Sequence, residues 1–245
     1  MQIYADLEAE QDALRGLVEG LPAIGWSAAS GAGGWSVSDV VLHLAQTEEF
    51  VVTAVRAGNV RVDLSVVVDT LDGVMAQLVE RERGRSGAEV LARWDAARRE
   101  ALTCLREADQ SNAVQWVASP LRPATLATTR LAEHWAHGLD IAAGLGAPYP
   151  DTARLRHVAW LAHRSIPYAY GIAGAAAPPA VRFELAGPAG EVWQIGPADA
   201  ECVVTGSAGE LCRIGARRLD PTESGVRVTG PGGERLLELL RNYAA

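Results

Sequence analysis

The stretch GWSVSDVVLHL, from Gly34 to Leu44, marks the beginning of a long helix. Ser36 is a favoured N-cap residue, and Asp39 three positions later completes a carboxylate variant of the capping box. The apolar residues that follow recur at spacings of three and four, which is the period of a helix with one buried face. These signals predict a helix over 37–57. His43 lies on its apolar stripe, so we expect this imidazole to point into a bundle.

Helical patterns also fill the chain on both sides of this stretch. Leu21-Pro22 ends a first helix, because the residue before a proline is pushed out of the helical region. The segment 112–123 holds two prolines and is predicted to be a loop or a short extended piece. Asp151 is predicted to cap a final helix. The sequence thus predicts an all-α block with further helices over 3–21, 61–83, 87–108, 124–145 and 151–170.

The pattern changes after a run of small residues and prolines at 171–179, which we interpret as a domain boundary. Period-two alternation then predicts a hairpin from 181–185 and 192–195. Further strands are expected at 201–205 and 226–229, and helices at 207–216 and 231–242. The predicted fold is α plus α+β, with a helical bundle over 1–174 followed by a small α+β domain over 180–245.

Composition excludes several classes of protein. The 245 residues carry a formal net charge of −8, and 49% of them are hydrophobic. An acidic chain is unsuited to nucleic acid or to anionic membranes, and a small-molecule substrate is the expected partner. The first residues lack the pattern of a signal peptide, and no apolar run is long enough for a membrane span, so we expect a cytoplasmic protein. Its three cysteines fit neither a disulfide framework nor a thiolate zinc site.

A second informative stretch is RLAEHWAHGLD, residues 130–140. Glu133 and His137 are four residues apart, so they project from the same face of a helix. A carboxylate and an imidazole one turn apart can bind one divalent ion if a third ligand comes from elsewhere. His43 is the leading candidate for that third ligand.

Spacing alone leaves other interpretations open. His43 can be a core histidine that is satisfied by a hydrogen bond, and Glu133 with His137 can be an exposed pair on a helix surface. His134 can pair with His137 at i,i+3 instead. Asp140 is either an acceptor that orients His137 or a surface aspartate.

The two stretches together resemble the DinB-like metal-binding superfamily, and within it the mycothiol-dependent maleylpyruvate isomerase family. The resemblance covers nearly the whole chain. Its C-terminal part is similar to the family's sterol-carrier-like α+β domain, with turns at 205–208 and 228–231.

This resemblance implies a ligand set and a class of reaction. The metal ligands would be His43, Glu133 and His137, and the ion would be zinc with one open coordination position. Such a site lowers the pKa of a bound thiol or water and polarises a carbonyl. Arg217 and Arg218 lie in a stretch that is comparable to the family's C-terminal basic residue, so one of them would anchor a substrate carboxylate as a catalytic residue.

The leading hypothesis is therefore a metal-dependent enzyme that acts on a small organic electrophile, with mycothiol as a cosubstrate in a transferase or isomerase reaction. A second hypothesis omits the thiol and assigns the ion to a hydrolase, lyase or cyclase of a secondary-metabolite pathway. A third is a non-catalytic ligand-binding protein. The sequence gives no indication of oligomeric state.

Overall fold

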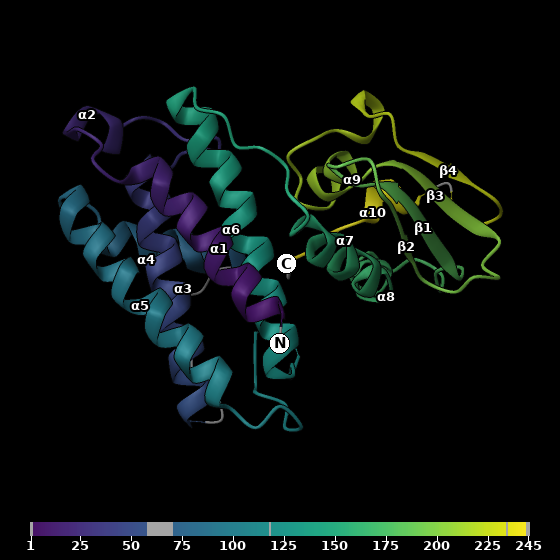
Figure 1. Cartoon of the computed structure of the whole chain (residues 1–245), viewed down its shortest axis with the longest axis horizontal. Coiled ribbons are helices and arrows are strands. Elements are labelled where there is room, and N and C mark those ends of the chain that lie inside the picture. The colour runs from purple at the N-terminus through teal and green to yellow at the C-terminus, as the bar shows by residue number, and fades with distance from the viewer. Residues whose placement is uncertain (1, 58–70, 118, 234, 244–245) are drawn as a thin grey trace. The chain divides into compact units, whose positions relative to one another are not determined.

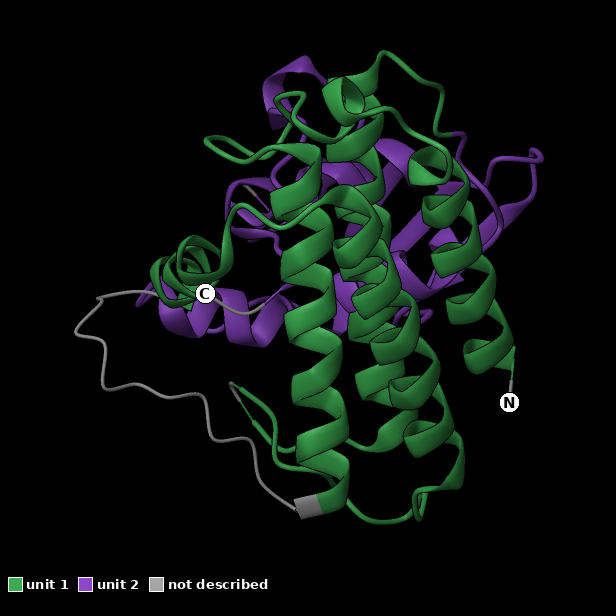
Figure 2. Ribbon diagram, turned by 90° about the vertical axis from the view of Figure 1, so that its left-hand side faces the viewer, with its two compact units in different colours: residues 1–149, 244–245 green, residues 150–243 purple. Residues whose placement is uncertain are grey.

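A computed structural model describes residues 2–57, 71–117, 119–233 and 235–243. The chain divides into two compact units, which Figure 2 shows in different colours. The first, which we call the helical unit, ends at Tyr149, and the second, the mixed unit, covers Pro150–Tyr243. A helical part followed by a smaller α+β part confirms the predicted fold class.

The helical unit is built on long helices that pack side by side (Figure 1). Helix α3 packs along α5, and α1 packs along α6. Further contacts of α3 with α6, of α5 with α6 and of α1 with α5 close the bundle. Its helices are α1 (Gln2–Val18), α2 (Ala23–Trp26), α3 (Val37–Ala57), α4 (Leu71–Glu82), α5 (Gly87–Glu107) and α6 (Pro123–Leu145).

Helix α3 has the predicted bounds and the predicted cap. The backbone N–H of Asp39 donates to the Ser36 hydroxyl, and the Asp39 carboxylate accepts from the Ser36 backbone N–H at 2.9 Å. Behind this cap Val40, Val41 and Leu44 are fully buried. The capping box and the apolar stripe therefore begin the helix at Val37 and turn the face that carries His43 inward.

The neighbouring helices agree with the sequence in most of their bounds. Helix α5 begins behind Ser86, which forms a capping box with Glu89. Helix α6 ends at Gly146, whose φ of +61° is the left-handed conformation that glycine adopts without strain. Part of the helix predicted over 61–83 lies outside the described residues, and its described part is α4. The described residues of the segment before α6, 112–117 and 119–122, are irregular apart from one bridge between Val114 and Leu121.

The mixed unit surrounds a four-stranded sheet of order β2-β1-β3-β4. Strand β1 is antiparallel to β2, as the predicted hairpin requires, and parallel to β3. Helix α7 packs against α9 and β2, and α10 packs against α8. The elements are α7 (Leu155–Arg164), α8 (Ile166–Ile172), β1 (Val181–Ala186), β2 (Val192–Ile195), β3 (Cys202–Ser207), α9 (Ala208–Gly215), η1 (Pro221–Glu223), β4 (Arg227–Thr229) and α10 (Leu236–Leu239).

Several features of the mixed unit differ from the sequence-based expectation. The units divide at Pro150 rather than near residue 174, because α7 and α8 pack with α9, α10 and the sheet. The single helix predicted over 151–170 is instead two helices that meet at Ser165. Pro167 explains the break, since it has no N–H to continue the helical ladder.

The predicted cap of that helix was also wrong. Asp151 does not cap α7; its carboxylate instead accepts hydrogen bonds from Arg213 on α9, at 2.8 and 2.9 Å. The helix predicted over 231–242 is reduced to α10, because Gly230 and Gly232 have φ values of +90° and +76° that lie outside the helical region.

Other predictions concern the thiols and the membrane. Cys104, Cys202 and Cys212 are buried, and none of the three forms a disulfide. Within the described ranges, no helix has both the length and the apolarity that crossing a membrane needs.

Candidate metal centre

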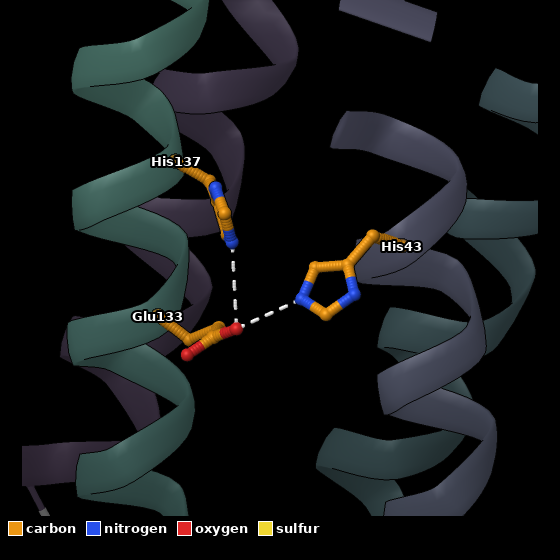
Figure 3. Close-up of side chains that lie close together, drawn as sticks. All are labelled: His43, Glu133 and His137. Carbon is orange, nitrogen blue, oxygen red and sulfur yellow. Dashed lines mark hydrogen bonds and ion pairs between the residues drawn. The ribbon is translucent and has the colours of Figure 1, made fainter. Parts of the chain in front are cut away.

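Three polar side chains from two helices meet inside the helical unit (Figure 3). His43 comes from α3, whereas Glu133 and His137 lie one turn apart on α6. The Nε2 of His43 is 2.9 Å from Oε1 of Glu133, and the Nε2 of His137 is 3.4 Å from the same oxygen. One nitrogen or oxygen of each residue lies within 4.8 Å of the other two. The structure thus brings together the residues that the sequence singled out.

This donor set fits a divalent cation such as zinc. Imidazole nitrogens and a carboxylate oxygen are common zinc ligands, and bonds of about 2.0–2.2 Å place tetrahedral ligand atoms about 3.4 Å apart. The distances of 2.9 and 3.4 Å that join the two Nε2 atoms to Glu133 are close to this spacing. Because three protein ligands leave one tetrahedral position open, the arrangement suits a catalytic rather than a purely structural ion.

A hydrogen bond orients one of the two histidines. The Nδ1 of His137 lies 2.9 Å from Oδ2 of Asp140, whose residue is 3% exposed. Burial alone would lower the pKa of His137, but the hydrogen bonds to Asp140 and Glu133 outweigh it and raise that pKa. Asp140 is thus the acceptor that holds Nδ1 of His137 and leaves Nε2 directed at the other donors.

The remaining two donors are poised in the states that a metal requires. Burial would raise the pKa of Glu133, but hydrogen bonds from His137 and His43 hold that pKa well below its usual range. Burial lowers the pKa of His43, despite its hydrogen bond to Glu133. A carboxylate that stays ionised and an imidazole that stays neutral are the forms that bind cations.

Trp35 forms an aromatic wall beside these residues. Its ring centroid lies 5.0 Å from that of His43 and 6.2 Å from that of His137. The same residue also lines a cleft of about 730 Å³, a volume in the range of small-molecule sites. The other lining residues come from α2 and the loop that follows it, from the start of α3, and from the turn between α4 and α5. They are Ala23, Trp26, Ser27, Ala29, Ser30, Gly34, Ser36, Ser38, Asp39, Arg83, Gly84, Arg85, Ser86 and Gly87.

His134 does not join this cluster. Its Nδ1 lies 2.8 Å from the carbonyl oxygen of Arg130, and its Nε2 accepts a hydrogen bond from Nε1 of Trp94 at 3.3 Å. Burial and the nearby charge of Arg130 lower the pKa of His134 well below its usual range. Both ring nitrogens are engaged, so the pairing of His134 with His137 that the sequence left open is not the one the structure forms.

Sequence reasoning missed a buried ion pair beside the cluster. Arg130 on α6 donates from Nε to Oε1 of Glu48 on α3 at 2.9 Å, and both side chains are almost inaccessible to solvent. A signal was present, because Glu48 lies four residues after Leu44 and three before Val51, on the same stripe of buried apolar residues. A carboxylate on such a stripe indicates a buried partner.

Arg217 and Arg218 belong to the mixed unit, just after α9, and both are exposed. Arg217 has a φ of +60°, an uncommon conformation for a residue other than glycine. Arg218 donates to the carbonyl oxygen of Ala216 at 2.6 Å.

Comparison with known proteins relates the chain to a named family. Residues 7–142 match the family model described as the mycothiol maleylpyruvate isomerase N-terminal domain. Uncharacterized proteins of two Mycobacterium tuberculosis strains, CDC 1551 and H37Rv, are each 35% identical over 244 residues, covering 98% of this chain and 94% of theirs.

Solved structures show the same fold. The crystal structure of the mycothiol-dependent maleylpyruvate isomerase is similar with a TM-score of 0.63 and 16% identity, over 93% of this chain and 91% of that one. A histidine-to-alanine mutant of that enzyme gives a TM-score of 0.63 at 14% identity, over 92% of this chain and 91% of that one.

A helical bundle with a His-Glu-His cluster between two helices is consistent with the DinB-like superfamily that the two motifs resemble. The chain belongs to the family defined by the mycothiol maleylpyruvate isomerase N-terminal domain, as the resemblance of its two motifs predicted.

Proposed function

We propose that this protein is a divalent-metal enzyme that uses a thiol cosubstrate of the mycothiol type in a transfer or isomerisation reaction on a small organic electrophile. One observation carries the proposal: two imidazoles and a carboxylate from separate helices converge within 4.8 Å. Membership of a family named for a mycothiol-dependent isomerase supports the thiol and the class of substrate. The proposed ligands are His43, Glu133 and His137, and the proposed ion is zinc.

The chemistry would divide between the ion and the surrounding side chains. A divalent ion with one anionic ligand supplies a net positive charge that lowers the pKa of a thiol and polarises a carbonyl. Glu133 contributes the negative charge, and Asp140 holds the Nδ1 proton of His137. Trp35 keeps an apolar surface against both imidazoles, which limits the access of water on that side.

A basic residue of the mixed unit completes the proposal. Arg217 or Arg218 would pair with a carboxylate of the substrate, since a guanidinium offers two parallel N–H donors of matching geometry. Replacement of the responsible arginine by Lys should then raise KM for a carboxylate substrate more than it lowers kcat, because a point charge replaces a bidentate donor.

The metal is tested first on the purified protein. We expect about one zinc per chain by elemental analysis and a higher Tm on addition of zinc to the apoprotein, because a ligand that binds only the folded state stabilises it. Glu133→Gln should keep the fold and lose most of the affinity. A wild-type protein that neither retains nor gains stability from zinc or nickel would remove the basis of the proposal.

The thiol is tested on cobalt-substituted protein. Titration with mycothiol, or with a simpler low-molecular-weight thiol, should produce a sulfur-to-cobalt charge-transfer band in the near ultraviolet. A protein that binds cobalt without ever showing this band would instead favour the thiol-independent hydrolase, lyase or cyclase. A third result, stoichiometric metal with no thiol binding and no turnover, would favour a ligand-binding protein.

A further inference from the structure

The two candidate histidine ligands are held in different ways. The Nδ1 of His137 is fixed by Asp140, as described above. The Nδ1 of His43 is buried and has no hydrogen-bond partner in the described part of the chain. Ligating histidines are normally oriented through the ring nitrogen that does not bind the metal. With Nδ1 unpartnered among the described residues, the position of the His43 ring depends on its packing against Trp35 and on where the backbone of α3 lies.

Three side chains tie that part of α3 to α6. Thr47 and Glu48 follow His43 by about one turn, and Arg130 precedes Glu133 by about one turn on the other helix. Arg130 donates to Oε1 of Glu48 at 2.9 Å and to Oγ1 of Thr47 at 2.7 Å. All three side chains are buried.

The same chain of hydrogen bonds reaches His43 itself. The Thr47 hydroxyl, which accepts from Arg130, lies 3.0 Å from the carbonyl oxygen of His43 and 3.1 Å from that of Leu44, and its single O–H donates to the backbone at these two residues. Arg130 is thus connected to the backbone of one candidate ligand through Thr47, while its own helix carries Glu133 and His137. A guanidinium can do this because its rigid fork offers donors in two directions.

Taken together, these contacts point to a positioning role. We propose that Arg130, Thr47 and Glu48 form a clamp that sets the separation of His43 from Glu133 and His137. This inference rests on the proposed metal site. Glu48 has a second task in the clamp, because an uncompensated arginine so near the site would repel a dication, and its carboxylate neutralises that charge.

The clamp is tested by measuring zinc affinity with a chromophoric competitor on folded protein. Glu48→Gln keeps the shape of the side chain and removes its charge, and we expect the Kd for zinc to rise about 10–100-fold, as for other outer partners of a metal site. Glu49→Gln is the matched control, because it makes the same charge change one residue away at a half-buried position that is paired with Arg93 instead of Arg130. The Kd of Glu49→Gln for zinc should stay within about twofold of the wild-type value, well below the change expected for Glu48→Gln.

A second pair of variants isolates the geometric role. Thr47→Val keeps the volume and removes the hydroxyl, so it should weaken zinc binding about tenfold and change the position or intensity of the visible bands of bound cobalt. Thr47→Ser keeps the hydroxyl and should restore both. This pair also decides the matter if Glu48→Gln does not fold.

The outcomes separate the clamp from the site. A wild-type protein that binds zinc, with Glu48→Gln or Thr47→Val folded and equal to it in Kd and cobalt spectrum, would overturn the clamp alone. A wild-type protein that binds no zinc would overturn the metal site and the clamp with it.

Discussion

Helix α6 presents two sets of polar residues that differ in how completely their hydrogen bonds are satisfied. In the first set, Glu133 and His137 direct a carboxylate oxygen and an imidazole nitrogen toward His43 on α3. On the other set Arg130 and His134 are engaged by Glu48, Thr47 and Trp94. Residues of similar chemistry, within two turns of one helix, thus form an available ligand set and a closed structural network.

The difference shows what separates a candidate site from a polar core. His134 is fully buried and both of its nitrogens have partners, whereas His137 is 9% exposed and shares one carboxylate oxygen with another histidine. The Nε2 atoms of His43 and His137 share one oxygen of Glu133, so this arrangement satisfies hydrogen bonds poorly. It does place three ligand atoms where they can surround a cation. The predictions below test this contrast.

The largest expected effect is the loss of metal binding when a ligand is removed. His137→Gln should raise the Kd for zinc by more than about 100-fold, because it deletes a direct ligand. A change of about 100-fold is the upper end of what is expected when a residue that only hydrogen-bonds to a ligand is replaced. The measurement is zinc content after dialysis together with a competition titration. His157→Gln, at a histidine of α7 in the mixed unit, is the control and should retain the wild-type zinc content.

Removal of the neighbouring histidine should affect stability instead. His134→Ala leaves a cavity and takes a partner from Trp94 and from the carbonyl of Arg130, so we expect the free energy of unfolding of the helical unit to fall by about 2–4 kcal/mol. Urea titration followed by circular dichroism measures it. If folded His134→Ala protein loses its zinc while its stability is unchanged, the contrast between the two histidines is wrong.

A smaller change in affinity is expected from the residue that orients His137. Asp140→Asn keeps a hydrogen-bond acceptor but removes the charge, so the Kd for zinc should rise about tenfold, the lower end of the range for such partners. Asp39→Asn serves as a comparison, since that carboxylate caps α3 and pairs with Arg83 rather than with a histidine of the cluster. An unchanged Kd in Asp140→Asn would mean that the Nδ1 contact does not orient the ligand.

The pKa values of His137 and His134 should be shifted in opposite directions in the apoprotein. The pKa of His137 is raised, so its stabilising contribution is present below the unfolded pKa of about 6.5 and is lost as the pH rises through the folded pKa. The pKa of His134 is lowered, so the unfolded state gains the proton first and stability falls as the pH drops below about 6.5. NMR of the imidazole nitrogens between pH 5 and 8 measures both. A charged His134 at pH about 6, near the unperturbed value, would contradict the assignment.

Much of this arrangement was predictable from local signals. The Ser36–Asp39 box and the apolar spacing located α3 to the residue, and the four-residue spacing of Glu133 and His137 placed them on one face. Whether His43 reached them was decided in the sequence only by a family resemblance, because the packing of α3 against α6 depends on contacts far apart in the chain. The break at Ser165 was missed although Pro167 signals it, since the apolar periodicity continues through both helices.

The buried ion pair of Glu48 and Arg130 could not be predicted from the two motifs alone. Glu48 lies on an apolar stripe, which indicates a partner but not which one. Arg130 begins the second motif, and only the fold brings it across to α3. The charge balance of the site thus depends on a long-range contact between Glu48 and Arg130, which residue spacing along the chain could not predict.

The smallest effect concerns the loop before α3. The backbone N–H of Gly31 donates to the carbonyl oxygen of Asp140 at 2.8 Å, and a Cβ there would lie 3.1 Å from the Asp140 Cα and 3.2 Å from its Oδ1. Gly31→Ala must therefore shift Asp140 by a few tenths of an ångström, and through it the ring of His137. We expect a rise in the Kd for zinc of about threefold, below the about tenfold of a lost outer partner.

Gly33→Ala is the matched control for this effect, because it adds the same methyl group to the same loop at a position with no atom within 4 Å. Isothermal titration with zinc resolves a difference of this size if both variants have the wild-type Tm. Equal affinities in the two variants would show that Asp140 absorbs the shift without moving His137, so the orientation of that ligand would be set by α6 alone.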